Sequence, residues 1–223
     1  MKKLIVFLLA LCPLAGMAQK NVWEIPDQPQ QQKQEVKKES KKKVVSTVDQ
    51  KYLAGAVPEV NGSVVFTLDK DVPGMSADSI YSKVYAVVNE IVEEGKSADL
   101  QPAGRIAAVN KAEHTLAARM KEWLVFSSNF ISLDRTVFNY TLVAQATDGH
   151  IHVTIDRISY AYEMERKDAS GMQVKAENWI TDKYALNKKG TKLSRISGKF
   201  RRKTIDRKDN IFQRIEAALN IKH

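Results

Sequence analysis

The stretch YTLVAQATDGHIHVTIDRISYAY, residues 140–162, decides the fold. Asp148-Gly149 lies at its centre, and this dipeptide is typical of a two-residue type I′ turn between antiparallel strands. With the turn there, one face pairs only apolar residues: Ala146 with Ile151, Ala144 with Val153 and Leu142 with Ile155. The other face pairs polar residues, Thr147 with His150 and Gln145 with His152. Because turn and pattern agree, we predict a hairpin of fixed register with one buried face.

The apolar positions change phase at the end of this register. Ile155 is followed by Ile158, Tyr160 and Tyr162, so the apolar positions move from odd to even numbers. One extra residue in the strand restores a single apolar face. We therefore predict a β-bulge near Asp156-Arg157.

A strand and a long helix precede the hairpin. Residues 63–68 are rich in β-branched and aromatic side chains and lie between turn-forming dipeptides, which favours a strand. Ser76 is a suitable N-cap for a helix that runs to about Glu94, with Gly95 as its stop. The apolar positions of this helix follow steps of three and four, which predicts one buried stripe: Ala77, Ile80, Tyr81, Val84, Val87, Val88, Ile91 and Val92.

Residues 105–126 are ambiguous when only their own types are considered. Alanines, Leu116 and Met120 favour a helix. Apolar runs at 106–109 and 123–126 favour two strands joined around residues 111–114. Both alternatives stay open.

The C-terminal part is basic and ends in a helix. Residues 178–186 are a candidate short helix on the sheet, and residues 188–203 are basic and interrupted by glycine. A final helix is predicted from about Thr204 to Leu219. Its buried stripe comprises Ile211, Phe212, Ile215, Ala218 and Leu219.

Residues 1–18 have the layout of a secretory signal peptide. Lys2 and Lys3 precede an apolar run of about 11 residues, and small residues end the segment, so we place cleavage after Ala18. The run is shorter than the roughly 20 residues that a transmembrane helix needs. We expect export to the periplasm, the cell surface or the medium with no transmembrane span. An uncleaved anchor is the alternative.

The single cysteine, Cys12, lies inside this leader. Leu11 and Pro13 flank it, which does not suit the lipidated cysteine of a lipoprotein. A mature chain without a thiol has no disulfide framework, no cysteine metal ligand and no thiol nucleophile.

Residues 19–61 are predicted to be a disordered polar and basic tether. Glutamines at 28–32 and lysines at 37–43 bury too little apolar surface to offset the entropy of ordering. Trp23 and Ile25 are the exceptions, either as a short docking motif or as isolated apolar residues.

The order of these elements predicts an α+β fold: a curved antiparallel sheet with a long helix packed on one face and a C-terminal helix. The domain spans residues 62–220, with residues 162–203 as a basic extension within it. The leader and three stretches together resemble a known family. The stretches are residues 62–67 with 73–76, residues 123–126 and the hairpin end at 155–158.

The family is DUF4468, an exported domain of unknown function of Gram-negative bacteria described as having a TATA-binding-protein-like (TBP-like) fold. The resemblance covers residues 61–162. It implies paired strands for residues 105–126 and a helix-grip-like sheet. It carries no catalytic residues, because none are established for the family, and a fold name does not imply DNA binding.

The formal net charge of +9 falls to +7 when Lys2 and Lys3 leave with the leader. Export argues against nucleic acid as the partner and favours an envelope protein, anionic lipid or anionic polysaccharide. Residues 183–208 concentrate cations around one acidic residue, Asp206. The candidate residues for binding an anionic surface are Lys188, Lys189, Lys192, Arg195, Lys199, Arg201, Arg202 and Lys203. A solvated basic excursion without a ligand is the alternative.

Common catalytic motifs are absent from the sequence. His150 and His152 share a strand face and could start a metal site, but we interpret them as the polar face of the hairpin. Glu93 with Glu94, and Glu163 with Glu165, are the nearest candidates for a catalytic pair of carboxylates. Such a pair needs a cleft, and nothing in the sequence indicates one. We therefore predict no catalytic residue, no metal and no cofactor.

Four aromatic residues could line an apolar cavity between helix and sheet, or be ordinary core: Phe138, Tyr140, Tyr160 and Tyr162. The leading functional hypothesis is a non-enzymatic periplasmic or cell-surface binding module. The first alternative is a small carrier of an apolar ligand or lipid in such a cavity, and the second is an unrecognised hydrolase.

The leader gives the first testable prediction. Expression of the full chain in a Gram-negative host should give a mature protein that begins at Gln19, because Gly16 and Ala18 are small enough for signal peptidase. Intact-mass measurement of the envelope fraction checks this. A protein that retains Met1, or begins at Cys12 with lipid attached, contradicts the assignment.

Overall fold

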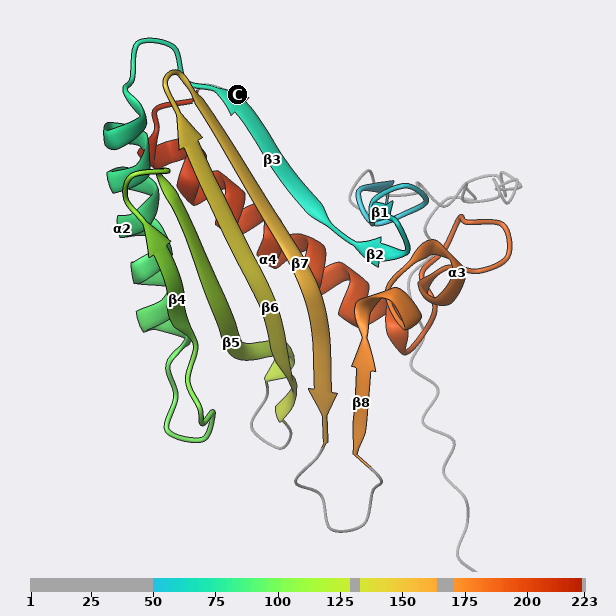
Figure 1. Cartoon of the computed structure of the whole chain (residues 1–223). Helices are drawn as coiled ribbons and strands as arrows, with labels where there is room; N and C mark the ends of the chain where they lie inside the picture. Colours follow the sequence, from blue (N-terminus) through green and yellow to red (C-terminus); the bar gives the residue numbers. More distant parts are fainter. Residues whose placement is uncertain (1–49, 129–132, 164–170, 222–223) are drawn as a thin grey trace, which may run out of the picture. The chain divides into compact units, whose positions relative to one another are not determined.

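Strands β6 (Leu133–Thr147) and β7 (His150–Tyr162) form the hairpin that the sequence predicts. A computed structural model describes residues 50–128, 133–163 and 171–221, and in it Ala146 pairs with Ile151, Ala144 with Val153 and Leu142 with Ile155 (Figure 1). Each of these six side chains is buried. The predicted signal peptide and residues 19–49 of the predicted tether lie outside the described residues.

The predicted β-bulge lies where the apolar pattern changes phase. Thr141 pairs with Asp156, but Asn139 pairs with Ser159, so β7 contains an extra residue between these pairs. Arg157 takes a positive φ of 50° at this point. The bulge returns Ile158 and Tyr160 to the buried face of the sheet.

The main sheet has the strand order β3-β7-β6-β5-β4, and all of its pairs are antiparallel. The additional strands are β3 (Phe66–Asp71), β4 (Arg105–Asn110), β5 (Thr115–Ser128) and β8 (Met172–Lys175). β8 pairs with the end of β7 beyond the bulge. The two strands β1 (Glu59–Val60) and β2 (Ser63–Val64) pair separately. Residues 105–126 are therefore largely paired strands, β4 and β5, joined by a turn at residues 111–114, as the resemblance implies.

Helix α2 (Ala77–Gly95) begins as its cap predicts. The Ser76 side chain accepts a hydrogen bond from the backbone N–H of Ser79. All eight apolar positions of the predicted stripe are buried. The helix includes Gly95, one residue beyond the expected end at Glu94.

The C-terminal helix, α4, comprises Ser197–Ala218. The sequence correctly predicts this helix but wrongly places its start at about Thr204. Short helices η1 (Ala176–Asn178) and α3 (Asp182–Ala185) occupy the region expected to be one short helix. Helices α2 and α4 contact each other and both contact β5. In Figure 1, α4 runs behind β5, β6 and β7.

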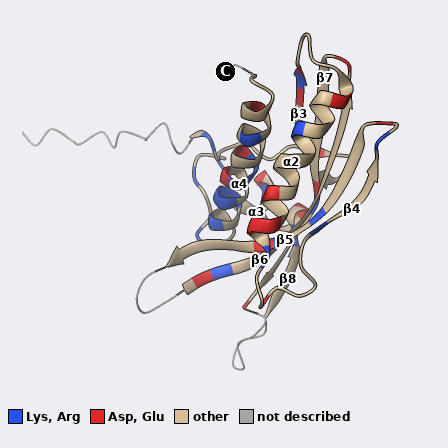
Figure 2. Ribbon diagram, turned by 90° about the vertical axis from the view of Figure 1, so that its left-hand side faces the viewer, with Lys and Arg blue, Asp and Glu red and all other residues tan. Residues whose placement is uncertain are grey.

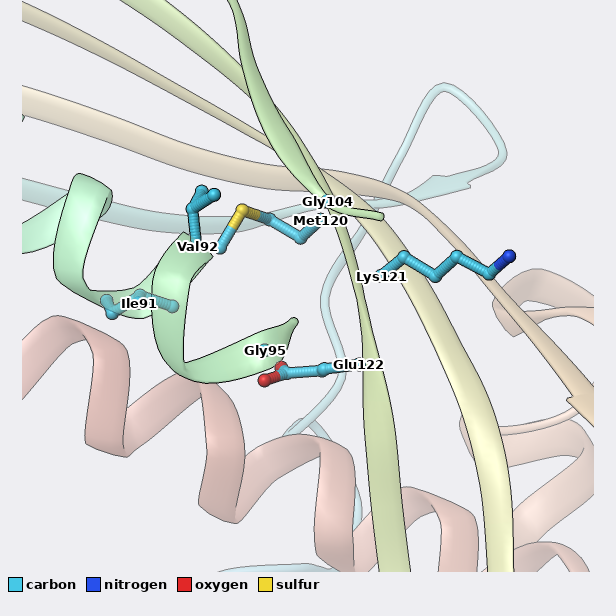
Figure 3. Close-up of a pocket in the computed structure, with 7 residues that line it drawn as sticks. All are labelled: Ile91, Val92, Gly95, Gly104, Met120, Lys121 and Glu122. Atoms are coloured by element: carbon cyan, nitrogen blue, oxygen red, sulfur yellow. The ribbon is translucent and has the colours of Figure 1, made fainter. Parts of the chain in front are cut away.

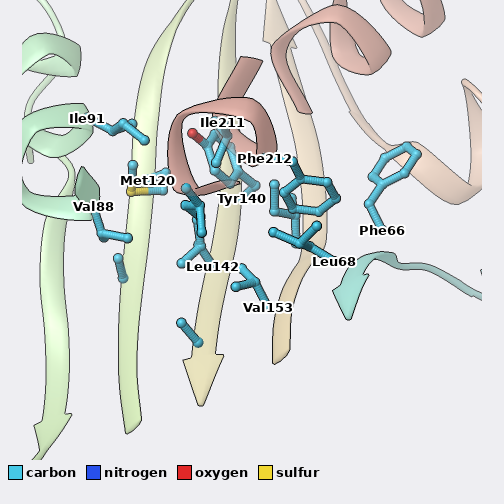
Figure 4. Close-up of a cluster of buried hydrophobic side chains, with 14 of the residues drawn as sticks. Phe66, Leu68, Val88, Ile91, Met120, Tyr140, Leu142, Val153, Ile211 and Phe212 are labelled. Atoms are coloured by element: carbon cyan, nitrogen blue, oxygen red, sulfur yellow. The ribbon is translucent and has the colours of Figure 1, made fainter. Parts of the chain in front are cut away.

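The core lies between this pair of helices and one face of the sheet (Figure 4). Phe138, Tyr140 and Tyr160 are among its fully or nearly fully buried side chains. The ring centroid of Phe138 lies 4.7 Å from that of Tyr140 and 5.7 Å from that of Tyr160. The Tyr160 hydroxyl shares a hydrogen bond of 2.7 Å with Thr204 of α4, and burial raises the pKa of this phenol. These rings pack against one another, as core residues do.

Residues 50–61, assigned to the tether from sequence, belong to the folded domain. Tyr52 and Val57 are buried, and the Tyr52 hydroxyl donates a hydrogen bond of 2.7 Å to Asp206 of α4. We call residues 50–57 the N-terminal strap. The domain therefore begins before residue 62, the predicted boundary.

Arg201 of α4 holds the strap in place. Its side chain is fully buried and donates hydrogen bonds of 2.6 Å to the carbonyl oxygens of Tyr52 and Leu53. A third bond of 2.8 Å reaches the carbonyl of Ile180, and an ionic contact of 2.7 Å reaches Asp182. The planar guanidinium can be buried here because each side of its fork has an acceptor.

Replacement of Arg201 should therefore destabilise the domain strongly. Arg201→Met removes a charged donor from three carbonyl groups and from the Asp182 carboxylate, so we expect a loss of about 3 kcal/mol in the free energy of unfolding. Urea denaturation measures it. Lys203→Met, on the same helix, is the control and should change stability by less than about 1 kcal/mol. Equal effects of the two substitutions would show that Arg201 does not clamp the strap.

Phe138 tests whether the aromatic cluster is core or cavity wall. Phe138→Ala removes a packed ring, so we expect a loss of about 3–5 kcal/mol in the free energy of unfolding. Val137→Ala, on the opposite face of the same strand, should cost less than about 1 kcal/mol. A small effect of Phe138→Ala, measured in the same denaturation experiment, would favour a cavity.

Candidate functional site

The structure divides the eight basic candidates into three groups. Lys188, Lys189, Lys192 and Arg195 are exposed in the segment between α3 and α4. Three more, in the first turns of α4, are half-buried: Lys199, Arg202 and Lys203. Arg201 is wrongly included among the surface candidates, because its guanidinium is fully buried against the strap.

The exposed group lies on an ordered loop. We call residues 183–196 the basic loop; it contains five cations and no acidic residue. Leu186 and Leu193 form a β-bridge, and the N–H of Asn187 donates to the carbonyl of Lys192 at 2.9 Å. The Asn187 side-chain oxygen accepts from the backbone N–H groups of Thr191 and Lys192. Gly190 has a φ of 66°, which allows the chain to reverse at this point.

The base of the basic loop sits directly on α4. A Cβ at Gly198 would lie 2.8 Å from the Cβ of Leu193, so only glycine allows this contact. At the tip, a Cβ built on Gly190 would lie 3.5 Å from the Cβ of Ala54 in the strap. The tip of the basic loop therefore lies close to the strap that Arg201 holds.

The cations of the basic loop are not neutralised by neighbours. Among the described residues, none lies within ion-pair distance of Lys183, Lys188, Lys189, Lys192 or Arg195. The acidic residue before the loop, Asp182, instead contacts Arg201 and accepts a hydrogen bond of 2.9 Å from the backbone of Gly55. The loop therefore presents a concentrated positive field to solvent.

Lys199 shows the opposite arrangement. Its ammonium group lies 2.7 Å from Asp134 and donates to the Tyr162 hydroxyl at 3.1 Å. Burial lowers the pKa of Lys199, but the hydrogen bonds to Asp134 and Tyr162 outweigh it, so the pKa is raised overall. Tyr162, the fourth predicted cavity residue, is thus part of a half-buried polar contact. Because Lys199 is already paired, it is less suited than the loop cations to bind an anion.

His150 and His152 lie on the sheet face away from the helices, beside strand β3. The Nδ1 atom of His150 lies 3.0 Å from Asp71, and that of His152 lies 2.5 Å from Asp69. The hydrogen bond from His152 lowers the pKa of Asp69. In the part of the chain that the structure describes, no three such side chains converge to hold a metal ion.

A buried ion pair, missed from sequence, joins β5 to α4. The Glu122 carboxylate accepts hydrogen bonds of 2.9 and 2.7 Å from Arg207 and one of 3.0 Å from the Tyr140 hydroxyl. Glu122 points toward Gly95 at the end of α2, while Lys121 points away from it (Figure 3). The hollow beside them has no room for a water molecule, so this network is structural.

A shallow groove of about 450 Å³ separates the outer faces of α2 and α4. Arg214 bridges one side of it, with contacts of 2.6 Å to Glu94 and 3.2 Å to Glu90. Figure 2 shows basic positions in blue along α4 and acidic positions in red along α2. Neither this groove nor the hollow at Glu122 is lined by any of the four candidate cavity aromatics. In the described ranges, no helix has both the length and the apolar character to cross a membrane.

Comparison with known proteins places the chain in a family. The model of a domain of unknown function (DUF4468) with TBP-like fold matches residues 66–161. No curated protein matches the sequence. The crystal structure of a DUF4468 family protein from Bacteroides ovatus ATCC 8483 is 41% identical with a TM-score of 0.67, and the match covers 76% of this chain and 94% of that one.

A second solved structure agrees in fold. A TBP-like protein from Parabacteroides distasonis ATCC 8503 is 20% identical with a TM-score of 0.59, over 75% of this chain and 99% of that one. At this identity the likeness concerns the fold alone. The helix-covered antiparallel sheet and the close match to the Bacteroides protein show that the chain belongs to the DUF4468 family with TBP-like fold.

Proposed function

We propose that this protein is an exported, non-enzymatic binding module that holds an anionic partner of the cell envelope through the basic loop. The observation that carries this proposal is the set of five exposed cations on an ordered loop, with no ion-pair partner among the described residues. An unpaired surface cation gains most from a ligand, because no existing contact must be broken.

The order of the loop supports binding over a solvated excursion. The bonds of Asn187 and the contact of Leu193 with Gly198 hold the backbone in one arrangement before any partner arrives. A preorganised site loses less conformational entropy on binding than a flexible one.

The location of the partner follows from the leader. A protein exported by the signal peptide at residues 1–18 meets lipid headgroups, polysaccharides and envelope proteins. Residues 19–49 lie between the predicted leader and the strap in the sequence, and their polar composition fits the tether that the sequence predicts.

A binding role also fits the absence of common catalytic motifs from the sequence. The aromatic cluster that would line a carrier's cavity packs against itself and α4. The basic loop is therefore the strongest functional feature of the described domain.

Binding to polyanions tests the proposal. The chain from Gln19 to His223 should bind both anionic vesicles and dextran sulfate, and affinity should fall steeply between low and high salt. The variant K188Q/K189Q/K192Q/R195Q should bind anionic vesicles on the order of 1,000-fold more weakly, since each of the four basic residues near an anionic membrane contributes about 1 kcal/mol.

The matched control is R105Q/K111Q/R119Q/K175Q. It removes the same charge from four exposed positions on β4, β5, β8 and the β4–β5 turn. Retained binding by this control, with loss in the loop variant, supports the basic loop as the site. Equal losses of vesicle affinity in both variants would show that binding depends on net charge and not on the basic loop, which contradicts the proposal. Absence of binding by the native chain would also refute it.

A further inference from the structure

Two large apolar side chains are exposed beside the cations of the basic loop. Ile196 is 61% exposed, more than any other large apolar side chain in the described part of the chain, and Tyr184 is 41% exposed. Single exposed apolar residues are common on protein surfaces. This pair is unusual because each member directly follows a cation: Lys183 comes before Tyr184, and Arg195 comes before Ile196.

The backbone holds the two side chains in one region. The Ser197 hydroxyl donates a hydrogen bond of 2.7 Å to the carbonyl of Tyr184. The N–H of Ser194 donates a bond of 2.8 Å to the carbonyl of Ala185. Residues 184–185 and 194–197 therefore run side by side, so the backbone positions of Tyr184 and Ile196 lie on neighbouring segments of the chain.

The chemistry of this surface suits a bilayer more closely than a polysaccharide. A hydrated anionic polysaccharide offers negative charge but no hydrocarbon phase for an exposed isoleucine. An anionic bilayer offers both, with phosphate groups for lysine and arginine and an acyl boundary for apolar side chains. Tyrosine is suited to the headgroup level, where its ring is partly buried and its hydroxyl stays in water.

We propose that Tyr184, Ile196 and the basic loop form a surface that docks on an anionic lipid bilayer. The loop cations contact lipid phosphates, and the Ile196 side chain enters the boundary between headgroups and acyl chains, with Tyr184 beside it. This inference rests on the proposed function, because it names the anionic partner of the basic loop. The positive charge of the loop favours binding to anionic lipids. The two exposed apolar side chains favour a lipid bilayer over polyanions that have no hydrocarbon phase.

The test compares a lipid polyanion with a polyanion that has no lipid. The variant Y184S/I196S keeps all five cations, so its affinity for dextran sulfate should be unchanged. Its affinity for vesicles of phosphatidylcholine and phosphatidylglycerol should fall about 10-fold or more, because the apolar contact is lost. The control Y85S/V109S removes an exposed tyrosine and an exposed valine from α2 and β4 and should retain both affinities.

A single-site probe gives an independent readout. A mature chain that begins at Gln19 has no cysteine, so Ile196→Cys can carry an environment-sensitive dye alone. Its emission should shift to shorter wavelength and increase on anionic vesicles but not on dextran sulfate. The same dye at Val109→Cys should not respond. Circular dichroism and urea midpoints confirm that each variant is folded.

The outcomes separate the two proposals. Binding to dextran sulfate but not to vesicles, or equal vesicle affinity of Y184S/I196S and the native chain, overturns lipid docking and leaves the anionic binding module standing. Binding to neither polyanion by the native chain overturns both. A loss specific to vesicles, with a dye response at position 196, supports lipid docking.

Discussion

The pairing of β6 with β7 around Asp148-Gly149 determines which side chains meet the helices. A slip of one residue would turn Ala144 and Leu142 outward and bring Gln145 to the core, so the turn and the apolar face fix each other. The bulge at Arg157 then keeps the same face buried beyond the point where the pattern changes phase. This single buried face is what α2 and α4 cover, and the rest of the domain is arranged around it.

Arg201 connects the core of the domain to the segments around the candidate site. Its buried guanidinium joins α4 to the strap and to the segment before α3, and it occupies Asp182, the acidic residue nearest the basic loop. The loop cations form no ion pair with the described residues, while the loop packs on α4 at its base and lies close to the strap at its tip. Arg201 contributes to this arrangement by contacting Asp182, the acidic residue that precedes the loop.

The charged residues of the domain fall into two groups, those paired within the domain and those of the basic loop. Glu122 with Arg207 and Lys199 with Asp134 are already satisfied within the domain, so they specify packing. The basic loop is ordered by backbone and asparagine hydrogen bonds, and its charged groups form no ion pair with the residues that the structure describes. This division, and the exposed apolar pair beside the loop, are the physical grounds on which we propose an envelope-binding role.

The sequence by itself determined the hairpin register, the bulge, the buried stripe of α2 and the α+β class, because each follows from a local turn, cap or period. It also indicated the basic segment as a candidate site. Only the tertiary structure decided that residues 50–61 are folded, that α4 begins at Ser197 and that Arg201 is buried. Arginine side chains are usually exposed on protein surfaces. Arg201 can be buried because the carbonyl groups of Tyr52, Leu53 and Ile180 accept its hydrogen bonds. These three residues are remote from Arg201 in sequence, so no local sequence pattern predicts the contact.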